Sequence, residues 1–125
     1  MNYYLIIATG GAFGAVSRYA LSGFAEKYNT TAFPVGTFLV NLIGSLLIGI
    51  VAILLLEKFP LDQHLRPLVI VGFLGAFTTF STFSLEVVLL LQQGNYTTAG
   101  SYLAMSVVTC VLATWAGMQL ARTFV

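Results

Sequence analysis

Residues 72–83 read GFLGAFTTFSTF and lie inside a long apolar segment. The stretch holds two glycines, four hydroxyl side chains and four phenylalanines. Glycine lowers helix propensity, and clustered Thr and Ser offer the backbone alternative hydrogen bonds. Lipid has no hydrogen-bonding groups for a freed backbone, so such a break must face protein or a wet cavity. We therefore predict a broken helix that serves an ion, with freed carbonyls suited to a cation and freed amides to an anion.

The composition around this stretch predicts an integral membrane protein. The chain has 125 residues, of which 58% are hydrophobic and 7% are charged, whereas soluble domains carry about 25% charged residues. A net charge of +1 gives no electrostatic basis for nucleic-acid binding. Cys110 is the only cysteine, which excludes an intramolecular disulfide and a cysteine-cluster metal site. Lipid is thus the expected surroundings and nucleic acid is not an expected partner.

Four segments are long and apolar enough to cross a bilayer, which takes about 20 residues. They are residues 3–23, 35–56, 67–91 and 98–121. The connections between them are short and leave no room for a further domain. We therefore expect one all-α domain over residues 1–125, with four transmembrane helices and a break in the third.

The charges do not fix the orientation of these spans. With four spans, one side of the membrane carries Lys58, Arg66 and Arg122, and the other carries Arg18 and Lys27. This difference is a weak positive-inside signal. The chain either inserts in one orientation or inserts both ways and pairs antiparallel with itself, which would supply the inverted symmetry common in transport proteins.

Three polar residues within the spans are candidates for function. Arg18 lies near the end of the first span, where a guanidinium reaches either a lipid headgroup or an aqueous vestibule. Asn41 lies inside the second span and is either an interhelical bond or a pore-lining donor. Glu86 is the only acidic residue deep in a span, so it is functional, a partner for Arg18 or a residue near the membrane interface.

Polar side chains also recur every fourth residue along the last span. Tyr102, Ser106, Cys110 and Thr114 therefore share one face of the helix. Hydroxyl groups could pass a small anion from one donor to the next. The alternative is a polar seam between helices, and the Cys110 thiol is the weakest donor of the four.

Phenylalanines and glycines add two further observations. Phe80 and Phe83 are three residues apart, so they should project on nearly the same side of the resumed helix. The positive edges of their rings could stabilise an anion, although both rings could equally be packing residues. Gly10 and Gly14 form a GxxxG motif, which indicates close helix packing, most simply within the chain.

Three motifs together resemble those of the Fluc (CrcB) fluoride channels. They are GGAFGAVSRY at residues 10–19, GTFLVNLIG at residues 36–44 and the stretch at residues 72–83. The motifs fall in order on three of the four predicted spans, and the length and the number of spans match as well.

This resemblance implies a fluoride-selective passive channel that exports fluoride across a bacterial plasma membrane and so relieves its toxicity. The expected assembly is a dual-topology homodimer with two antiparallel pores. Phe80 and Phe83 would line each pore edge-on, and Asn41 would contribute a donor. The backbone carbonyls of Gly75 and Thr78 from both protomers would hold a structural sodium ion.

The same resemblance implies a set of further site residues. Those expected along the fluoride pore are Ser81, Thr82, Glu86, Tyr102, Ser106 and Thr114. Arg18 is expected in the vestibule. Cys110 departs from the small hydroxyl residues of this track, which leaves its role open.

Three other functions fit the sequence less well. A small multidrug-resistance-type exporter matches in size and topology, but such exporters use a carboxylate in the first span and residues 3–23 contain none. A structural subunit would give no reason for the phenylalanine pair and the polar column to occur together. An enzyme is not expected, because His64 lies in a loop without a nucleophile or a metal-ligand set.

Overall fold

Helices make up the ordered elements of residues 2–60 and 63–125, which are the residues that the computed structural model describes. The first two rods are α1 (Tyr3–Lys27) and α2 (Val35–Ile53), with α2 continued by the π-helix η1 (Leu54–Lys58). The third rod begins as the π-helix η2 (Pro67–Leu74), continues as α3 (Gly75–Phe77) and resumes as α4 (Phe80–Gln92). The last rod is α5 (Tyr96–Phe124).

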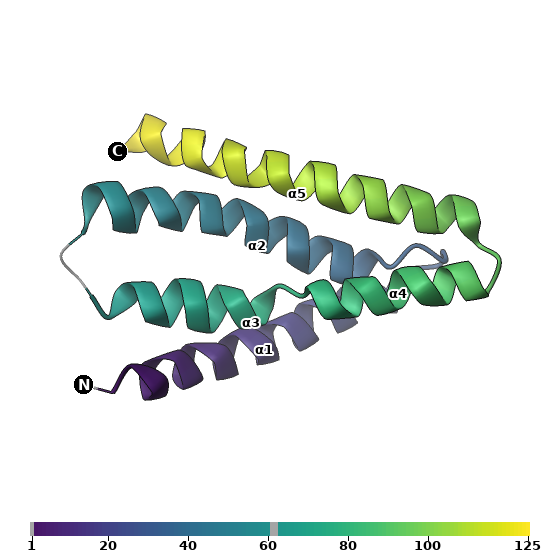
Figure 1. Ribbon diagram of the computed structural model, residues 1–125, viewed down its shortest axis with the longest axis horizontal. Coiled ribbons are helices and arrows are strands. Elements are labelled where there is room, and N and C mark those ends of the chain that lie inside the picture. Colours follow the sequence, from purple (N-terminus) through teal and green to yellow (C-terminus); the bar gives the residue numbers. More distant parts are fainter. Residues whose placement is uncertain (1, 61–62) are drawn as a thin grey trace.

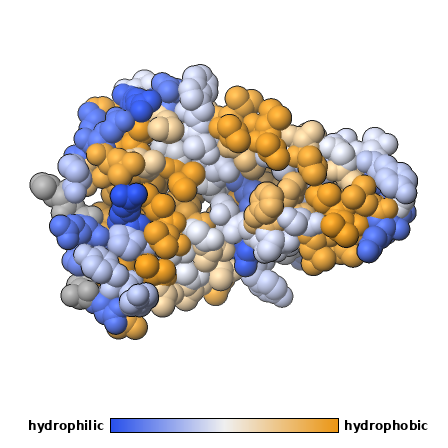
Figure 2. All heavy atoms as spheres, in the orientation of Figure 1, coloured by the Kyte–Doolittle hydropathy of each residue, from blue (hydrophilic) through white to orange (hydrophobic). Residues whose placement is uncertain are grey.

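The rods run up and down in a bundle, and both termini lie at one end with the α2–η2 connection (Figure 1). Within it α5 packs mainly on α2, while α1 packs mainly on η2. Hydrophilic residues gather at the end that carries the termini and occur again at the opposite end, and hydrophobic residues cover much of the visible surface between them (Figure 2). This distribution suits a bundle surrounded by lipid.

Within residues 2–60 and 63–125, three helical segments are long and apolar enough to cross a membrane, namely Val35–Lys58, Pro67–Gln92 and Tyr96–Phe124. The helix α1 has 25 residues, but its glycines, tyrosines and Arg18 make it less apolar. The predicted spans 3–23, 35–56, 67–91 and 98–121 end short of the helices, which reach Lys27, Lys58, Gln92 and Phe124. The apolar residues define only the part of each helix that faces lipid, whereas the helical hydrogen bonds continue beyond it.

The GxxxG motif packs inside the chain, as its simpler interpretation predicted. A Cβ added to Gly10 would collide with the carbonyl oxygen of Leu68, and one added to Gly14 with that of Phe73. The backbone of α1 therefore lies directly on η2, which is the approach that small residues permit in membranes.

A second glycine seam joins α2 to α5. A Cβ on Gly49 would collide with the carbonyl oxygen of Thr114, and a Cβ on Gly117 with that of Leu46. Each helix thus places a glycine against the backbone of the other. The two seams fix the rods in pairs, with α1 on η2 and α2 on α5.

The structure confirms the break in the third rod. The helix α3 ends at Phe77, Thr78 has ψ 158° and Thr79 has φ −151° and ψ 121°, so both residues are extended. Beyond them α4 begins at Phe80, and the hydroxyl of Thr79 caps it by accepting the N–H of Thr82 at 3.1 Å. The hydroxyl of Thr79 therefore starts the resumed helix.

We expect Gly117→Ala to lower the stability of the folded chain by about 1–3 kcal/mol, because a methyl group has no space against Leu46. Thermal unfolding in detergent measures the effect. The control is Gly100→Ala on the same helix, where an added Cβ meets nothing within 4 Å and alanine favours the helix. Equal stability of the two variants would contradict the seam.

Candidate functional site

The side chain of Asn41 on α2 holds the break in place. Its Oδ1 accepts the backbone N–H of Thr79 at 2.8 Å, and its Nδ2 donates to the backbone carbonyl of Thr79 at 3.0 Å. One amide thus satisfies both backbone groups of a residue that has left the helix, which lipid could not do. The structure shows the interhelical bond that was one of two alternatives for Asn41, and the second N–H of the amide remains for another acceptor.

The break also frees carbonyls of the preceding helix from their usual partners. In an α-helix each N–H bonds the carbonyl four residues earlier, so Thr79 N–H would pair with Gly75 and Thr82 N–H with Thr78. The first N–H goes instead to Asn41, and the second goes to the Thr79 hydroxyl. The carbonyls of Gly75 and Thr78 therefore lie at the break without their helical partners.

A groove with a volume of about 410 Å³ runs beside the break. Its polar wall includes Asn41, Ser45, Thr78, Thr79, Ser106 and Cys110. Apolar side chains from α2, α4 and α5 supply most of the remaining wall. Residues from three rods therefore meet at the point where the third rod opens.

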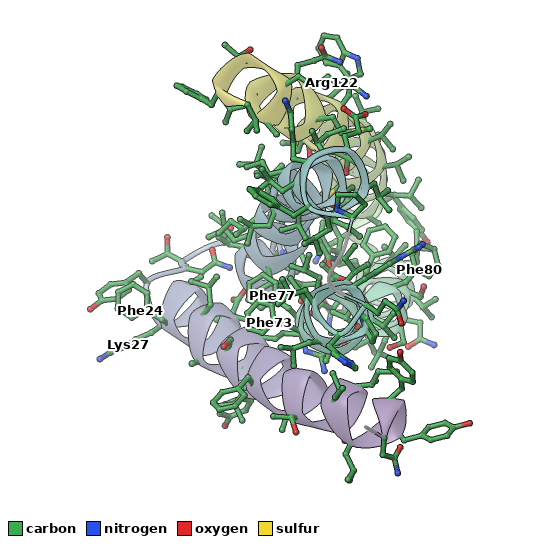
Figure 3. The ribbon with its side chains drawn as sticks, turned by 90° about the vertical axis from the view of Figure 1, so that its left-hand side faces the viewer. Phe24, Lys27, Phe73, Phe77, Phe80 and Arg122 are labelled. Atoms are coloured by element: carbon green, nitrogen blue, oxygen red, sulfur yellow. The ribbon has the colours of Figure 1, made fainter. Side chains whose placement is uncertain are left out.

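Phe80 and Phe83 both line this groove but differ in exposure. Their ring centroids are 5.5 Å apart. Phe83 is 6% exposed and makes an edge contact with Tyr102 at 5.0 Å, whereas Phe80 is 76% exposed. Phe80 points outward, on the opposite side of its rod from Phe73 and Phe77 (Figure 3). The rings are neighbours as expected, but only one of them belongs to the core of the chain.

The polar column on α5 divides into two parts. The Thr114 hydroxyl donates to the carbonyl of Ser45 at 2.9 Å and lies 3.2 Å from that of Cys110, so it belongs to the interhelical seam. Ser106 is 6% exposed, and its hydroxyl has no hydrogen-bond partner among the described residues. A buried hydroxyl without a partner is uncommon and destabilising, so Ser106 is the position in this column whose hydroxyl is free to donate to a ligand.

Glu86 joins the column at Tyr102 rather than pairing with Arg18. Its two carboxylate oxygens accept the hydroxyls of Thr37 at 2.7 Å and Tyr102 at 2.6 Å. The single hydroxyl hydrogen of Tyr102 is therefore directed at Glu86.

A second cavity of about 470 Å³ lies on the other side of this network. It is bounded by the end of α1, the start of α2 and the first turns of α4, and its polar lining includes Ser22, Glu26, Asn29, Thr37, Thr82 and Glu86. Arg18 is half-buried on α1, one helical turn before Ser22, and does not line the cavity. Ser81 is exposed, and its hydroxyl lies 3.3 Å from that of Thr79.

Two residues of this region were missed by sequence reasoning. Glu26 accepts the backbone N–H of Gly36 at 2.7 Å and the side-chain amide of Asn29 at 3.0 Å, so it stabilises the start of α2. A carboxylate near a helix N-terminus is favourable, and the nearby Pro34 was an available signal. Thr37 gave no such signal, because a single Thr in a span usually bonds its own backbone.

A family model described as CrcB-like protein, Camphor Resistance (CrcB), matches residues 5–118. The chain belongs to the CrcB family. Among its relatives, a protein of Magnetococcus marinus is 47% identical over 116 residues, which are 93% of this chain and 94% of the relative. One of Hahella chejuensis is 44% identical over 120 residues, covering 96% and 94%. One of Geobacter sulfurreducens is 44% identical over 122 residues, covering 98% of each chain.

All three relatives carry the name fluoride-specific ion channel FluC, which is the name of an ion channel and not of an enzyme. With its membrane-capable helices, this CrcB-family chain is a multi-pass bacterial membrane protein. The resemblance drawn from the three sequence motifs is confirmed.

We expect Asn41→Leu to destabilise the chain by about 2–4 kcal/mol, because it leaves both backbone groups of Thr79 unsatisfied. Thermal unfolding measures the loss, and hydrogen exchange at the Thr79 amide should accelerate. The control is Asn95→Leu at the start of α5, where the side chain makes no capping bond. If exchange at Thr79 were unchanged, the bond would not hold the break.

Proposed function

We propose that this CrcB-family chain forms a passive, fluoride-selective ion channel that exports cytoplasmic fluoride. The relatives are named as fluoride-specific channels, which supports fluoride as the ion that is transported. The observation that carries the proposal for this chain is the unpartnered Ser106 hydroxyl in the wall of a groove that also holds Asn41 and Phe83. A donor without a protein acceptor, beside a phenylalanine ring, suits a small and strongly hydrogen-bonding anion.

A passive pore is sufficient for this task. Hydrogen fluoride is a weak acid that crosses membranes in its neutral form and dissociates in a less acidic cytoplasm, where fluoride accumulates. A membrane potential of about 100 mV, negative inside, favours the exit of a monovalent anion by about 2.3 kcal/mol. No chemical energy source is needed once a selective path exists.

The groove itself argues for a second copy of the chain. Its polar groups lie level with the middle of the third rod, at a depth where exposure to lipid is unfavourable. Gly75 is exposed, and an added Cβ would meet nothing closer than the Ile70 carbonyl at 3.6 Å, so its own chain does not require a glycine there. Close approach of a partner does explain one. We propose an antiparallel homodimer in which the copies, each crossing the membrane four times with α1 included, close each other's grooves into two pores.

The freed carbonyls of Gly75 and Thr78 suit a sodium ion between the two copies. Unwound backbone carbonyls are the ligands that transport proteins use for Na⁺, and these two have lost their helical N–H partners. A bound sodium ion would supply positive charge that holds the carbonyls of both copies together. Asn41 positions them through its bonds to Thr79.

Within each pore, Phe80 and Phe83 would present ring edges, and Ser106 and the second N–H of Asn41 would donate hydrogen bonds. Tyr102, Glu86 and Thr82 would lie toward the second cavity, with Arg18 and Ser81 near the pore ends. Thr114 would support the wall through Ser45 rather than bind the anion.

Reconstituted protein in liposomes should release fluoride, detected by an electrode under an imposed potential, and should retain chloride. Phe83→Ile should slow fluoride release at least about tenfold, which corresponds to about 1.4 kcal/mol of lost stabilisation. Phe80→Ile should have a similar effect. Phe13→Ile is the control, because Phe13 is exposed on α1 and does not line the groove.

Equal passage of chloride, or no fluoride release by the wild type, would overturn the proposed channel. Normal release by both groove variants would remove the role of the rings and leave the channel itself standing.

Ser106→Ala should separate stability from transport. The substitution removes a buried hydroxyl that has no partner in the described part of the chain, so the free energy of unfolding should stay the same or rise by about 1 kcal/mol. Fluoride release should fall because the pore loses a donor. A variant that became less stable, while its transport stayed normal, would show that Ser106 serves the fold instead.

A further inference from the structure

Cys110 lies in the wall of the groove, one helical turn after Ser106. It is the only cysteine of the chain, its thiol is free and its residue is half-buried. The Thr114 hydroxyl lies 3.2 Å from the Cys110 carbonyl, which ties that backbone into the seam with α2. The backbone of Cys110 is thus fixed relative to the groove, and the thiol projects from it.

An independent observation shows that this part of the wall has a free donor for a ligand. The neighbouring Ser106 is 6% exposed and its hydroxyl has no partner among the described residues, although buried hydroxyls normally find one. Asn41 lines the same groove and has a second amide hydrogen beyond the one bonded to Thr79. The thiol therefore lies among donors that face the space where the ligand would be.

We propose that Cys110 is a covalent modification site through which small, uncharged thiol-directed electrophiles close the ion path. This inference rests on the proposed channel function. The groove wall beside the thiol contains the apolar side chains of Val107 and Val111, which favour an uncharged reagent over a charged one.

Methyl methanethiosulfonate is a suitable probe of this class. The Cys110 thiolate attacks the sulfenyl sulfur of the reagent, so that a new S–S bond forms and the S–SO₂ bond breaks. Methanesulfinate leaves with the electron pair, and the thiol proton passes to water. The product carries a methylthio group in the groove and no longer has an S–H donor. Both changes oppose passage of a hydrogen-bonded anion.

The test uses the full chain reconstituted in liposomes, with fluoride release measured before and after treatment. Intact mass spectrometry should show one adduct on the wild type, and its fluoride release should fall at least tenfold and return after reduction with dithiothreitol. Cys110→Ser should gain no adduct, and its release should be the same before and after treatment.

A cysteine outside the groove serves as the matched control. Val108 is on the same helix, is 55% exposed and does not line the groove. The double variant Cys110→Ser with Val108→Cys should take the adduct without loss of release, which separates modification of the groove from modification of the helix.

Two results would overturn the proposal: an unmodified Cys110 in the folded protein, or a wild-type adduct without loss of release. A wild type with no fluoride release before treatment would instead refute the channel, and with it the block. The adduct would then still report whether the thiol is open to the groove, so the two failures are distinguishable.

Discussion

The paired hydrogen bonds between the Asn41 side chain and the backbone of Thr79 are the interaction on which the rest of the site depends. A membrane helix can open only where its backbone groups find partners, and a single amide supplies both of them here. By taking the N–H of Thr79, Asn41 also removes the helical partner of the Gly75 carbonyl. One side chain on α2 therefore stabilises the break and leaves one of its carbonyl oxygens without a helical partner.

The glycine seams keep this interaction in register. The backbones of α1 and η2 meet through Gly10 and Gly14, and those of α2 and α5 meet through Gly49 and Gly117. Backbone contacts leave little freedom for sliding, because a shift of one residue would bring a larger side chain into the seam. The polar groups of the groove are thus held by contacts that lie outside it.

Features that follow from local chemistry could be predicted from the sequence. Gly72, Gly75 and the run of hydroxyls indicated the break, and the apolar segments indicated the rods, since both depend on nearby residues. The partners of polar side chains could not be predicted, because they depend on how the rods are rotated. Thr114 therefore proved to be part of a seam, and Glu86 proved to bind Thr37 and Tyr102.

The direction in which the break faces depends on how many residues η2 contains. A residue advances an α-helix by about 100° around its axis and a π-helix by less, so one residue more or fewer between Pro67 and Gly75 would turn everything downstream by a large part of a right angle or more. The glycine seam with α1 fixes the rotation of η2 about its own axis. The wider π turns accommodate the residues between this seam and the bond from Asn41 to Thr79. A single-residue deletion in η2 would thus leave the composition of the rod almost unchanged while rotating Thr79 away from Asn41.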